Sequence, residues 1–600
     1  MLSPSQIIVL ATPVFFALIV VEWLISLKRG RNAYALADAV SSLNLGVLSQ
    51  TSAVFTKLLT LGIYTFVASH IALVQADHFW LSLPGWILAL IFYDFCYYWL
   101  HRMGHEVNVL WAAHVVHHQS QAYNLSTALR QTSSGALLGW VFYLPMALAG
   151  VPPLVFAVVG LIDLLYQFWV HTEQVKKLGW FDRWFCSPSN HRVHHAVNEQ
   201  YLDKNYGGIL IIWDRIFGTF KEEDDKEPCV YGTRGLLNSW DPLWANATVY
   251  RQLAHDSWFA RNGLDKIKVW FKPPGWRPLD VAQRFPKPEF NLDEHRILYA
   301  PPMNTPLRWF VSLQFAALIA GTTVFLWNAD QSPLATNLMW FGVLLTAQWA
   351  LSAAMQGRIS VWMALMLQSG ALAMATAALG LQQWHWFFKP LSMIFALVCI
   401  ATSHLNAMGT EKKLSTKQVS LLLAAIVFSL SGDVCLMLAN LFIPGLISFL
   451  LAHVCYIALF KTDAPWFANR RALWLIVAIG AGMYAYLWMN GLPSAIRLPV
   501  AVYVSVIALM AAQAWGRYQV LRERSSLLVA LGASAFMVSD SFLAINRFVQ
   551  PLPWSAIWVL ASYYIAQALI VQGSLRGQAQ SRTTPDLAVP PAIFPATQIT

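Results

Sequence analysis

Long apolar runs separated by shorter polar stretches cover most of this 600-residue chain. A membrane-spanning helix needs about 20 apolar residues, each adding about 1.5 Å of length. Runs that meet this requirement lie at roughly 6–27, 45–70, 83–100, 134–151, 153–170, 307–327, 334–353, 360–380, 388–404, 418–440, 443–460, 472–490, 496–514, 525–545 and 553–572. The pattern therefore predicts an all-α, polytopic membrane protein with about fifteen transmembrane helices.

The composition agrees with burial of apolar surface in lipid. Hydrophobic residues make up 57% of the chain and charged residues 12%, about half the charged fraction of soluble proteins. The formal net charge of +10 does not indicate nucleic-acid binding, because the basic residues lie in loops between the apolar runs. Six scattered cysteines without a CxxC pair suggest neither a disulfide framework nor a thiolate zinc site.

The positions of lysine and arginine predict the orientation in the membrane, because cytoplasmic loops are enriched in both. Lys28, Arg29 and Arg31 follow the first apolar run, and most later basic loops fall on the same side when the runs are threaded in order. We therefore expect the N-terminus outside and the C-terminus in the cytoplasm. Residues 171–306 contain no spanning run and are expected to form a cytoplasmic cap, and the tail at 574–600 is expected to be disordered.

Histidines gather in one section of the chain at helical spacing. One pair stands four residues apart, and two later groups each repeat the spacing i, i+3, i+4, so a helix would point each group to one side. A further histidine ends the fifth apolar run. The nine residues are His101, His105, His114, His117, His118, His171, His191, His194 and His195. We expect them to meet at the cytoplasmic face and to bind metal where a lipid tail arrives from the bilayer.

Imidazole suits several transition metals, so the ligand type does not identify the ion. Nine imidazoles exceed what one ion takes, and they fit two octahedral ions with positions left open for O2. A zinc hydrolase site would use three protein ligands and a water. The number of histidines therefore favours a two-ion centre that works with O2.

The spacing HxxxH, HxxHH and HxxHH resembles the fatty acid hydroxylase and sterol desaturase superfamily of membrane di-iron oxygenases. The segments YNLSTALRQ, SPSNHRVHHAVN and YLDKNYGGILIIWDRIFGTF are similar, more specifically, to the alkylglycerol monooxygenase family, over roughly 5–380. The resemblance implies the eight clustered histidines as ligands of two iron ions, with His171 added on its position. It also implies an ether-lipid substrate, O2, and tetrahydrobiopterin or another electron donor. Glu106 and Glu173 are candidates for orienting the imidazoles, whereas Asn205 and Tyr206 receive no role.

Two aspartates interrupt the later apolar runs, Asp433 in LSGDVCLML and Asp540 in FMVSDSFLA. A carboxylate inside a span costs about 2.5–3.5 kcal/mol, so we expect each to serve a partner or a reaction. A tyrosine follows each aspartate 23 residues later, Tyr456 and Tyr563, which indicates a short internal duplication that brings the aspartates toward a common axis. Helix capping or hydrogen bonding between helices is the alternative explanation.

The segments FFKPLSM, SGDVCLML and SYYIAQALIVQG resemble the YhhN-type lysoplasmalogenase family over roughly 386–573. The resemblance implies that Asp433 and Asp540 catalyse hydrolysis of the vinyl ether bond of lysoplasmalogens. Two nearby buried carboxyl groups suit this reaction, since one can stay protonated as acid while the other is ionised as base. Other polar residues of these runs that are candidates for lining the cavity are His453, Tyr456, Tyr503, Tyr563 and Gln567.

Together these patterns predict a histidine-rich di-iron hydroxylase module at 1–380 and a compact transmembrane helical bundle at 386–573, which both cleave ether lipids in the membrane. One alternative keeps the di-iron chemistry, changes the substrate to a sterol, fatty acid or carotenoid, and leaves the C-terminal domain without catalysis. Another alternative is a histidine-rich metal transporter, whose ligands would be distributed through the depth of the membrane.

Overall fold

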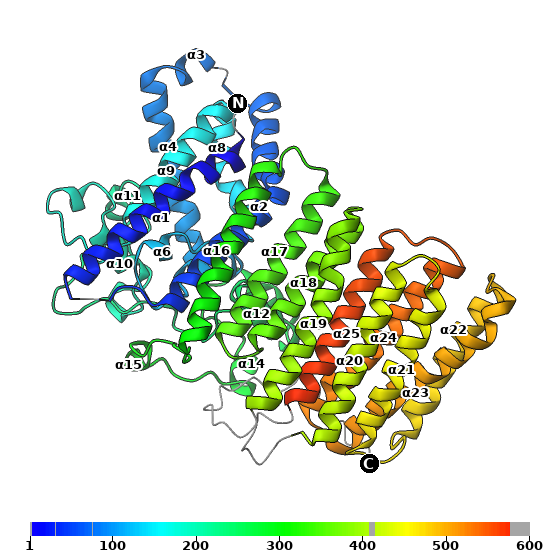
Figure 1. The fold of residues 1–600 in the computed structure, drawn as a ribbon. Helices are drawn as coiled ribbons and strands as arrows, with labels where there is room; N and C mark the ends of the chain where they lie inside the picture. The colour runs from blue at the N-terminus through cyan, green and yellow to red at the C-terminus, as the bar shows by residue number, and fades with distance from the viewer. Residues whose placement is uncertain (1–2, 31, 75, 407–413, 577–600) are drawn as a thin grey trace. The chain divides into compact units, whose positions relative to one another are not determined.

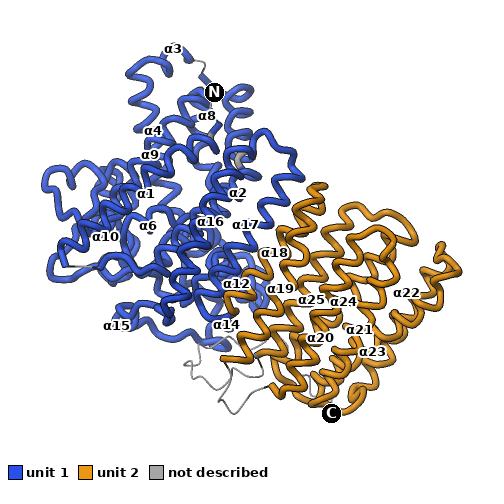
Figure 2. The backbone as a smooth tube through the Cα atoms, in the orientation of Figure 1, with its two compact units in different colours: residues 1–358 blue, residues 359–600 orange. Residues whose placement is uncertain are grey.

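The computed structural model describes residues 3–30, 32–74, 76–406 and 414–576, and this part of the chain consists of helices and loops without a β-strand (Figure 1). It confirms the all-α class. Contacts divide the chain into two compact units, residues 1–358 and 359–600 (Figure 2). The module boundary expected between 380 and 386 stays a prediction, and most of the tail expected to be disordered, 577–600, lies outside the described residues.

Unit 1 combines long apolar helices with a section of short helices. The long helices of this unit are α1 (Pro4–Lys28), α2 (Leu36–His70), α4 (Leu83–Glu106), α9 (Pro153–Trp169), α12 (Pro242–Phe259), α16 (Thr305–Asn328) and α17 (Leu334–Met355). Its shorter helices are α3 (Asp77–Trp80), α5 (Asn108–His118), α6 (Leu125–Ala128), α7 (Gly135–Leu138), α8 (Leu144–Leu148), α10 (Pro188–His195), α11 (Ile212–Ile216), α13 (Gly263–Phe271), α14 (Leu279–Arg284) and α15 (Leu292–His295). The short helices place polar side chains beside the ends of α4 and α9.

Unit 2 is a bundle of long helices. They are α18 (Val361–Ala378), α19 (Gln382–Asn406), α20 (Thr416–Met437), α21 (Phe442–Lys461), α22 (Arg470–Met489), α23 (Arg497–Leu521), α24 (Arg524–Phe548) and α25 (Ser555–Arg576). Glycines let these helices approach closely, as at Gly370 of α18, where a Cβ atom would lie 2.8 Å from the Tyr564 ring of α25. Close packing of this kind, rather than the hydrophobic effect, holds helices together in lipid.

Twelve helices of the described residues are long and apolar enough to cross a membrane, or thirteen if the bent pair 36–56 and 59–70 counts as one span. This supports an integral, multi-pass membrane protein, and the predicted number of about fifteen is approximate. The run at 134–151 forms short helices that are interrupted near Gly139, and the run at 153–170 forms the 17-residue helix α9. The expected sides of the two termini stay a prediction.

Candidate functional site

The nine predicted histidines lie together in two groups in unit 1. The first group contains His101, His105, His114, His118 and His194, and the second contains His117, His171, His191 and His195. Within each group, one ring nitrogen from every residue lies within 4.8 Å of the others. Sequence segments separated by up to about ninety residues therefore converge on two adjacent positions that each have the ligand types of a metal site.

Three short features of the sequence bring these side chains together. His101 and His105 lie in the last turns of α4, and Val107 has an extended backbone (φ −126°, ψ 120°) that ends α4 and starts α5. Helix α10 begins at Pro188, where Ser187 accepts a hydrogen bond from the Asn190 amide at 3.3 Å. Proline at the first helical position and serine at the N-cap both favour a helix start. The three histidine motifs therefore lie in the last turns of the long helix α4 and on the short helices α5 and α10.

Backbone carbonyls fix the tautomers of four of the histidine rings. The acceptors are the carbonyl oxygens of Tyr206, Arg130, Gln167 and Lys204, which lie 2.8–3.0 Å from Nδ1 of His101, His117, His171 and His194 respectively. A carbonyl oxygen can only accept, so Nδ1 carries the proton in each ring. The neutral ring then presents an unprotonated lone pair at Nε2, and this is the atom turned toward the other histidines.

The Nε2 atoms approach one another more closely than neutral lone pairs favour. His117 and His171 place theirs 3.1 Å apart, although Nδ1 of each ring already holds the proton. Two nitrogen ligands at about 2.1 Å and at right angles around one ion lie about 3.0 Å apart. The pairs His171–His191 and His191–His195, at 3.1 and 3.2 Å, match that spacing too. A cation between the rings would replace this repulsion by coordination.

The first group offers unpaired nitrogen atoms of the same kind. Nε2 of His101, His105 and His194 is buried without a hydrogen-bond partner among the described residues, and His114 and His118 place their Nε2 atoms 3.0 Å apart. A buried polar atom without a partner costs free energy, and metal coordination would satisfy all of these atoms together. The residues present therefore fit two metal ions.

Burial keeps the imidazoles outside the spanning helices neutral. It lowers the pKa of His117 to about 4 and lowers the pKa of other cluster histidines well below the usual value. The neighbouring histidines act in the same direction, because a second positive charge nearby disfavours protonation. Neutral imidazole is the form that binds metal, so the site is prepared for cations at neutral pH.

Two buried aspartates hold the loop that contains the Tyr206 carbonyl, the acceptor at Nδ1 of His101. Asp214 accepts hydrogen bonds from the amides of Tyr206 and Gly207, both at 2.8 Å, and Asp94 accepts from the Ile209 amide at 2.7 Å. These bonds hold the Tyr206 carbonyl against His101. None of the three residues Tyr206, Asp94 and Asp214 was predicted from the sequence to have a role in the site. Asp94 lies in the apolar run of α4, and such a position is a sequence signal for a fixed partner.

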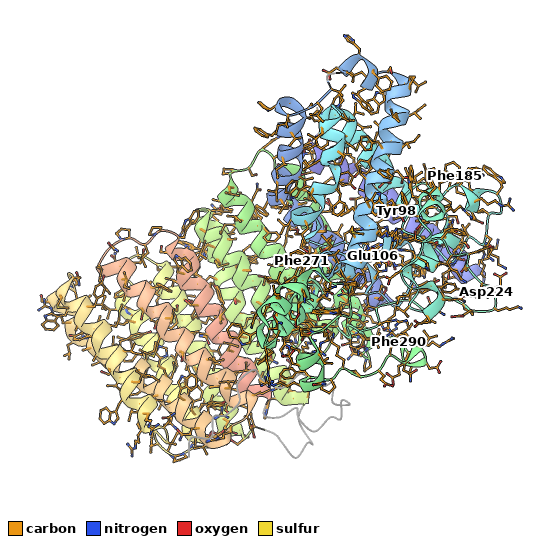
Figure 3. All side chains as sticks on the ribbon, turned by 180° about the vertical axis from the view of Figure 1, so that it is seen from behind. Tyr98, Glu106, Phe185, Asp224, Phe271 and Phe290 are labelled. Atoms are coloured by element: carbon orange, nitrogen blue, oxygen red, sulfur yellow. The ribbon has the colours of Figure 1, made fainter. Side chains whose placement is uncertain are left out.

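The two carboxylates predicted to orient the histidines contact other residues. Glu106 pairs with Arg102 at 2.8 Å, and Arg102 also donates to the Tyr98 hydroxyl on the same helix. Figure 3 labels Tyr98 and Glu106. Glu173 accepts a hydrogen bond from Tyr231 at 3.1 Å. Among the described residues, backbone carbonyls rather than these carboxylates accept the hydrogen bonds from Nδ1 of four histidine rings.

An apolar cavity leads to the second histidine group. It is lined by Ile8, Val9, Thr12, Phe15, Phe16, Leu43, Gly46, Val47, Gln50, His117, Ala128, Leu129, Gln131, Leu164, Gln167, Phe168, His171, Ile319, Thr322, Thr323 and Leu326. Most of the lining comes from α1, α2, α9 and α16, and His117 and His171 are its two histidines. The cavity therefore places apolar space next to the candidate metal position.

Unit 2 contains a separate polar cluster around Asp433 of α20. The Tyr563 hydroxyl donates to this carboxylate at 2.7 Å, and Lys389 of α19 lies 3.3 Å from it. No basic residue stands close to Asp433 in sequence, and the ion pair forms across helices instead. The hydroxyl of Tyr456 donates to Gln567 at 2.6 Å, so the tyrosine at the repeat spacing does not contact Asp433 through its hydroxyl.

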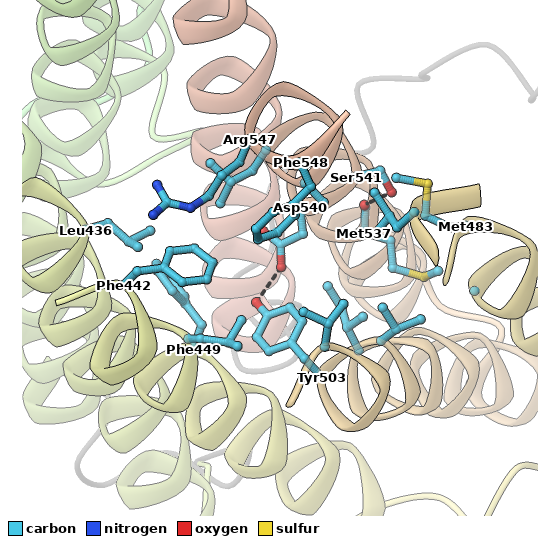
Figure 4. Close-up of a pocket in the computed structure, with 18 of the residues that line it drawn as sticks. Leu436, Phe442, Phe449, Met483, Tyr503, Met537, Asp540, Ser541, Arg547 and Phe548 are labelled. Carbon is cyan, nitrogen blue, oxygen red and sulfur yellow. Dashed lines mark hydrogen bonds between the residues drawn. The ribbon is translucent and has the colours of Figure 1, made fainter. Parts of the chain in front are cut away.

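Asp540 of α24 lies at the edge of an apolar cavity in the same unit (Figure 4). The Tyr503 hydroxyl donates to Asp540 at 2.5 Å, and Nε2 of His453 lies 3.1 Å from that hydroxyl oxygen. Since the hydroxyl proton is directed to Asp540, His453 donates to Tyr503. Asp540 lines the cavity, whereas Asp433 lies behind it, where its partner Tyr563 packs against the lining residue Phe449 with ring centroids 5.9 Å apart.

Comparisons with known proteins agree with both halves of the chain. The fatty acid hydroxylase family matches residues 86–219, and the YhhN family matches residues 384–574. Human alkylglycerol monooxygenase is 38% identical over 315 residues, covering 52% of this chain and 69% of the human protein. The zebrafish (Danio rerio) alkylglycerol monooxygenase is 41% identical over 269 residues, covering 45% of this chain and 59% of that protein.

The human lysoplasmalogenase TMEM86B is 33% identical over 156 residues, covering 26% of this chain and 64% of that protein. No solved structure matches the chain. The N-terminal similarity extends over more than two thirds of the human monooxygenase, and the fatty acid hydroxylase match contains all nine clustered histidines. This chain belongs to the alkylglycerol monooxygenase family, and it carries a YhhN domain in its C-terminal half.

Proposed function

We propose that unit 1 is an O2-dependent, di-iron monooxygenase that cleaves the alkyl ether bond of alkylglycerols. One oxygen atom of O2 would enter the C–H bond next to the ether oxygen, and two electrons and two protons would reduce the other atom to water. The resulting hemiacetal collapses to a fatty aldehyde and a free glycerol hydroxyl. Tetrahydrobiopterin, or another donor of two electrons, would be the reductant.

The observation that carries this proposal is the pair His117 and His171, whose unprotonated Nε2 atoms face each other at 3.1 Å at the end of an apolar cavity. Bound iron would supply activation of O2. The protein's own residues would hold the alkyl chain between α1, α2, α9 and α16 and exclude water from it. The carbonyls at Nδ1 would keep each ring in the tautomer and orientation that binds metal.

The proposed ligands are the nine histidines of the two groups, with His171 in the second group. The alternative of a metal transporter predicts ligands spread along the spans, whereas the histidines gather in two adjacent groups. The alternative of a sterol, fatty acid or carotenoid substrate keeps the same metal site and differs in the molecule that fills the cavity. The similarity to alkylglycerol monooxygenases over 315 residues favours an alkyl ether.

The test is to supply 1-O-alkylglycerol to membranes that contain the protein and to measure fatty aldehyde by mass spectrometry, with and without O2. Aldehyde that requires O2 and reductant supports the proposal. Supply of sterols, fatty acids and carotenoids in parallel distinguishes the alternatives. Turnover of one of these compounds without release of aldehyde from alkylglycerol would contradict it.

We further propose that unit 2 hydrolyses the vinyl ether of lysoplasmalogens, which carry an alkenyl chain on glycerol. A proton would add to the outer carbon of the double bond, and water would add to the carbon that bears the ether oxygen. The hemiacetal then loses its glycerol oxygen as an alcohol and leaves a fatty aldehyde. This sequence consumes one water and needs no metal, O2 or electron donor.

The surroundings of Asp433 and Asp540 support different roles for them. The Asp540 carboxyl group lines the cavity, where it can reach the alkenyl carbon, so we assign it as the proton donor to that carbon. Asp433 pairs with Lys389, which favours the ionised carboxylate, so we assign it as the base that activates water. Membranes given alkenyl lysolipid without O2 and with a chelator should still release aldehyde if this assignment holds.

The arrangement in the membrane is part of the proposal. We infer that residues 171–306 form a cytoplasmic cap, that the N-terminus lies outside, and that the histidine groups and the C-terminus face the cytoplasm. The distribution of lysine and arginine supports this orientation. A cytoplasmic metal centre would be within reach of a soluble electron donor.

A further inference from the structure

The cavity of unit 2 is apolar along most of its wall but carries opposite charges at two places on one helix. Asp540 and Arg547 both belong to α24, and both line the cavity, which is otherwise bounded mainly by aliphatic and aromatic side chains. Residues seven apart lie on the same face of a helix, two turns from each other, or about 10.5 Å along its axis. Figure 4 shows Asp540 beside Tyr503, and the Arg547 side chain extending toward Leu436 and Phe442.

Arg547 is free to bind an anion. It is exposed, and its guanidinium lies 4.0 Å above the centre of the Phe442 ring, which orients the group without using its donors. Within the described residues it takes part in no ion pair or hydrogen bond that would neutralise it. Asp540 does not serve as its partner, because the Asp540 carboxylate is engaged by Tyr503. A planar guanidinium with open donors matches a phosphate group.

We propose that Arg547 binds the phosphate of the lysolipid and thereby sets the position of the vinyl ether at Asp540. This inference rests on the hydrolase function proposed for unit 2. Seven bonds separate the outer alkenyl carbon, which Asp540 would protonate, from phosphorus in a 1-alkenyl-glycero-3-phospholipid, about 8 Å when extended. The remaining distance is within reach of the flexible arginine side chain, so one substrate spans both residues. The alkenyl chain then occupies the apolar remainder of the cavity.

The position of Arg547 in the cavity predicts selectivity for the phosphate of the lysolipid rather than for the head group attached to that phosphate. Of the described residues that line the cavity, Arg547 carries the positive charge and Asp540 is the acidic residue. Asp540 is already committed to Tyr503, so choline or ethanolamine finds no second acidic partner in the lining. Lysolipids with different head groups should therefore be cleaved with similar KM, and an alkenylglycerol without phosphate should bind much more weakly.

The test compares Arg547→Gln and Arg547→Lys with Arg497→Gln in the full-length protein. Arg497 is the matched control, because it also stacks on an aromatic ring at 4.0 Å, that of Trp488, but does not line the cavity. For 1-alkenyl-lysophospholipid, Arg547→Gln should raise KM about tenfold to a hundredfold with little change in kcat. It should leave cleavage of 1-alkenylglycerol unchanged, and Arg547→Lys should restore part of the affinity.

A binding measurement separates this inference from the hydrolase proposal. Binding of 1-O-hexadecyl-lysophosphocholine and of 1-O-hexadecylglycerol is measured without O2, so that neither lipid is consumed. Arg547→Gln should weaken binding of the phospholipid alone, and this result is independent of hydrolysis. If wild-type protein cleaves neither alkenyl lipid, the hydrolase function fails while the binding difference still tests Arg547. If Arg547→Gln and wild type bind the phospholipid equally, the inference is overturned. This result is expected for an arginine that contacts only phosphates of the bilayer. An equal loss for both lipids overturns it too.

Discussion

His117 and His171 face each other through Nε2 atoms 3.1 Å apart, although a backbone carbonyl holds the proton of each ring on Nδ1. Two neutral acceptors gain nothing from this approach, whereas an ion between them gains two ligands. The two residues stand 54 positions apart in the chain. Their approach therefore depends on how α5 packs against the end of α9. Because neither ring has a proton to share at Nε2, substitutions in the second histidine group test the metal site most directly.

Replacement of His117 by Ala should remove one of the four ligands of the second group and lower bound iron from about two ions to about one per chain. O2-dependent release of aldehyde from alkylglycerol should then be lost. Iron is measured by elemental analysis of purified protein. His295→Gln is the matched control, because His295 is also buried in unit 1 but contacts the carbonyls of Asn291 and Thr233. Full iron and activity in His117→Ala would refute the assignment.

Filling the unit 1 cavity should shorten the alkyl chain that it accepts. Thr322 of α16 is buried and lines the cavity, so Thr322→Trp should exclude a few methylene groups. Each buried methylene contributes about 0.8 kcal/mol, and a loss of about 2 kcal/mol lowers kcat/KM for hexadecylglycerol roughly 30-fold. Short-chain alkylglycerols should be affected much less. Leu313→Trp on the exposed face of α16 is the control, and an equal loss for all chain lengths would contradict the proposal.

Asp433→Asn and Asp540→Asn should each abolish cleavage of lysoplasmalogen by well over ~100-fold, because the amide keeps the shape but cannot exchange a proton. Both variants should keep the alkylglycerol activity of unit 1. Asp463→Asn, which breaks an ion pair with Arg517 away from the cavity, should keep both activities. Retained hydrolysis in both aspartate variants would mean that the carboxylates serve helix packing alone.

The hydrolase should work as a separate fragment when it includes α18. Ser369 of α18 donates to the Phe388 carbonyl of α19 at 3.0 Å, and Ser392 of α19 donates to the Met366 carbonyl of α18 at 3.0 Å. Each helix therefore donates a hydrogen bond to the backbone of the other. A fragment of residues 359–576 should cleave lysoplasmalogen with chelator and without O2. A fragment that begins at 382 should be less stable to heating. If both fragments melt at the same temperature, the contact with α18 is unimportant for this unit.

The orientation can be read with a reporter fused after Lys177. We expect a cytoplasmic signal, because the basic residues near the first span and the loop that contains Lys177 are predicted on the same side. A reporter after Asn328, at the end of α16, should give the opposite signal. An external signal after Lys177 would reverse the threading and remove the argument for a cytoplasmic electron donor.

Much of the metal site could be predicted from the sequence because its ligands repeat at helical spacing. HxxxH and HxxHH keep imidazoles on one side of a helix wherever that helix is placed, and all nine residues lie in the two groups of the structure. Apolar length likewise predicted a helical membrane protein, since a span is a property of one continuous segment. The number of spans was predicted only approximately, because the run near Gly139 is interrupted and α9 has only 17 residues.

The tertiary structure alone decided which partners these residues have. A tyrosine follows each buried aspartate 23 residues later in the sequence, but the hydroxyls that donate to Asp433 and Asp540 are those of Tyr563 and Tyr503. Lys389 and the carbonyls at Nδ1 of the histidines were also found only in three dimensions. Repeat spacing fixes the direction of a side chain on its own helix, whereas its partner depends on which helix packs opposite, and that is set by contacts between distant segments.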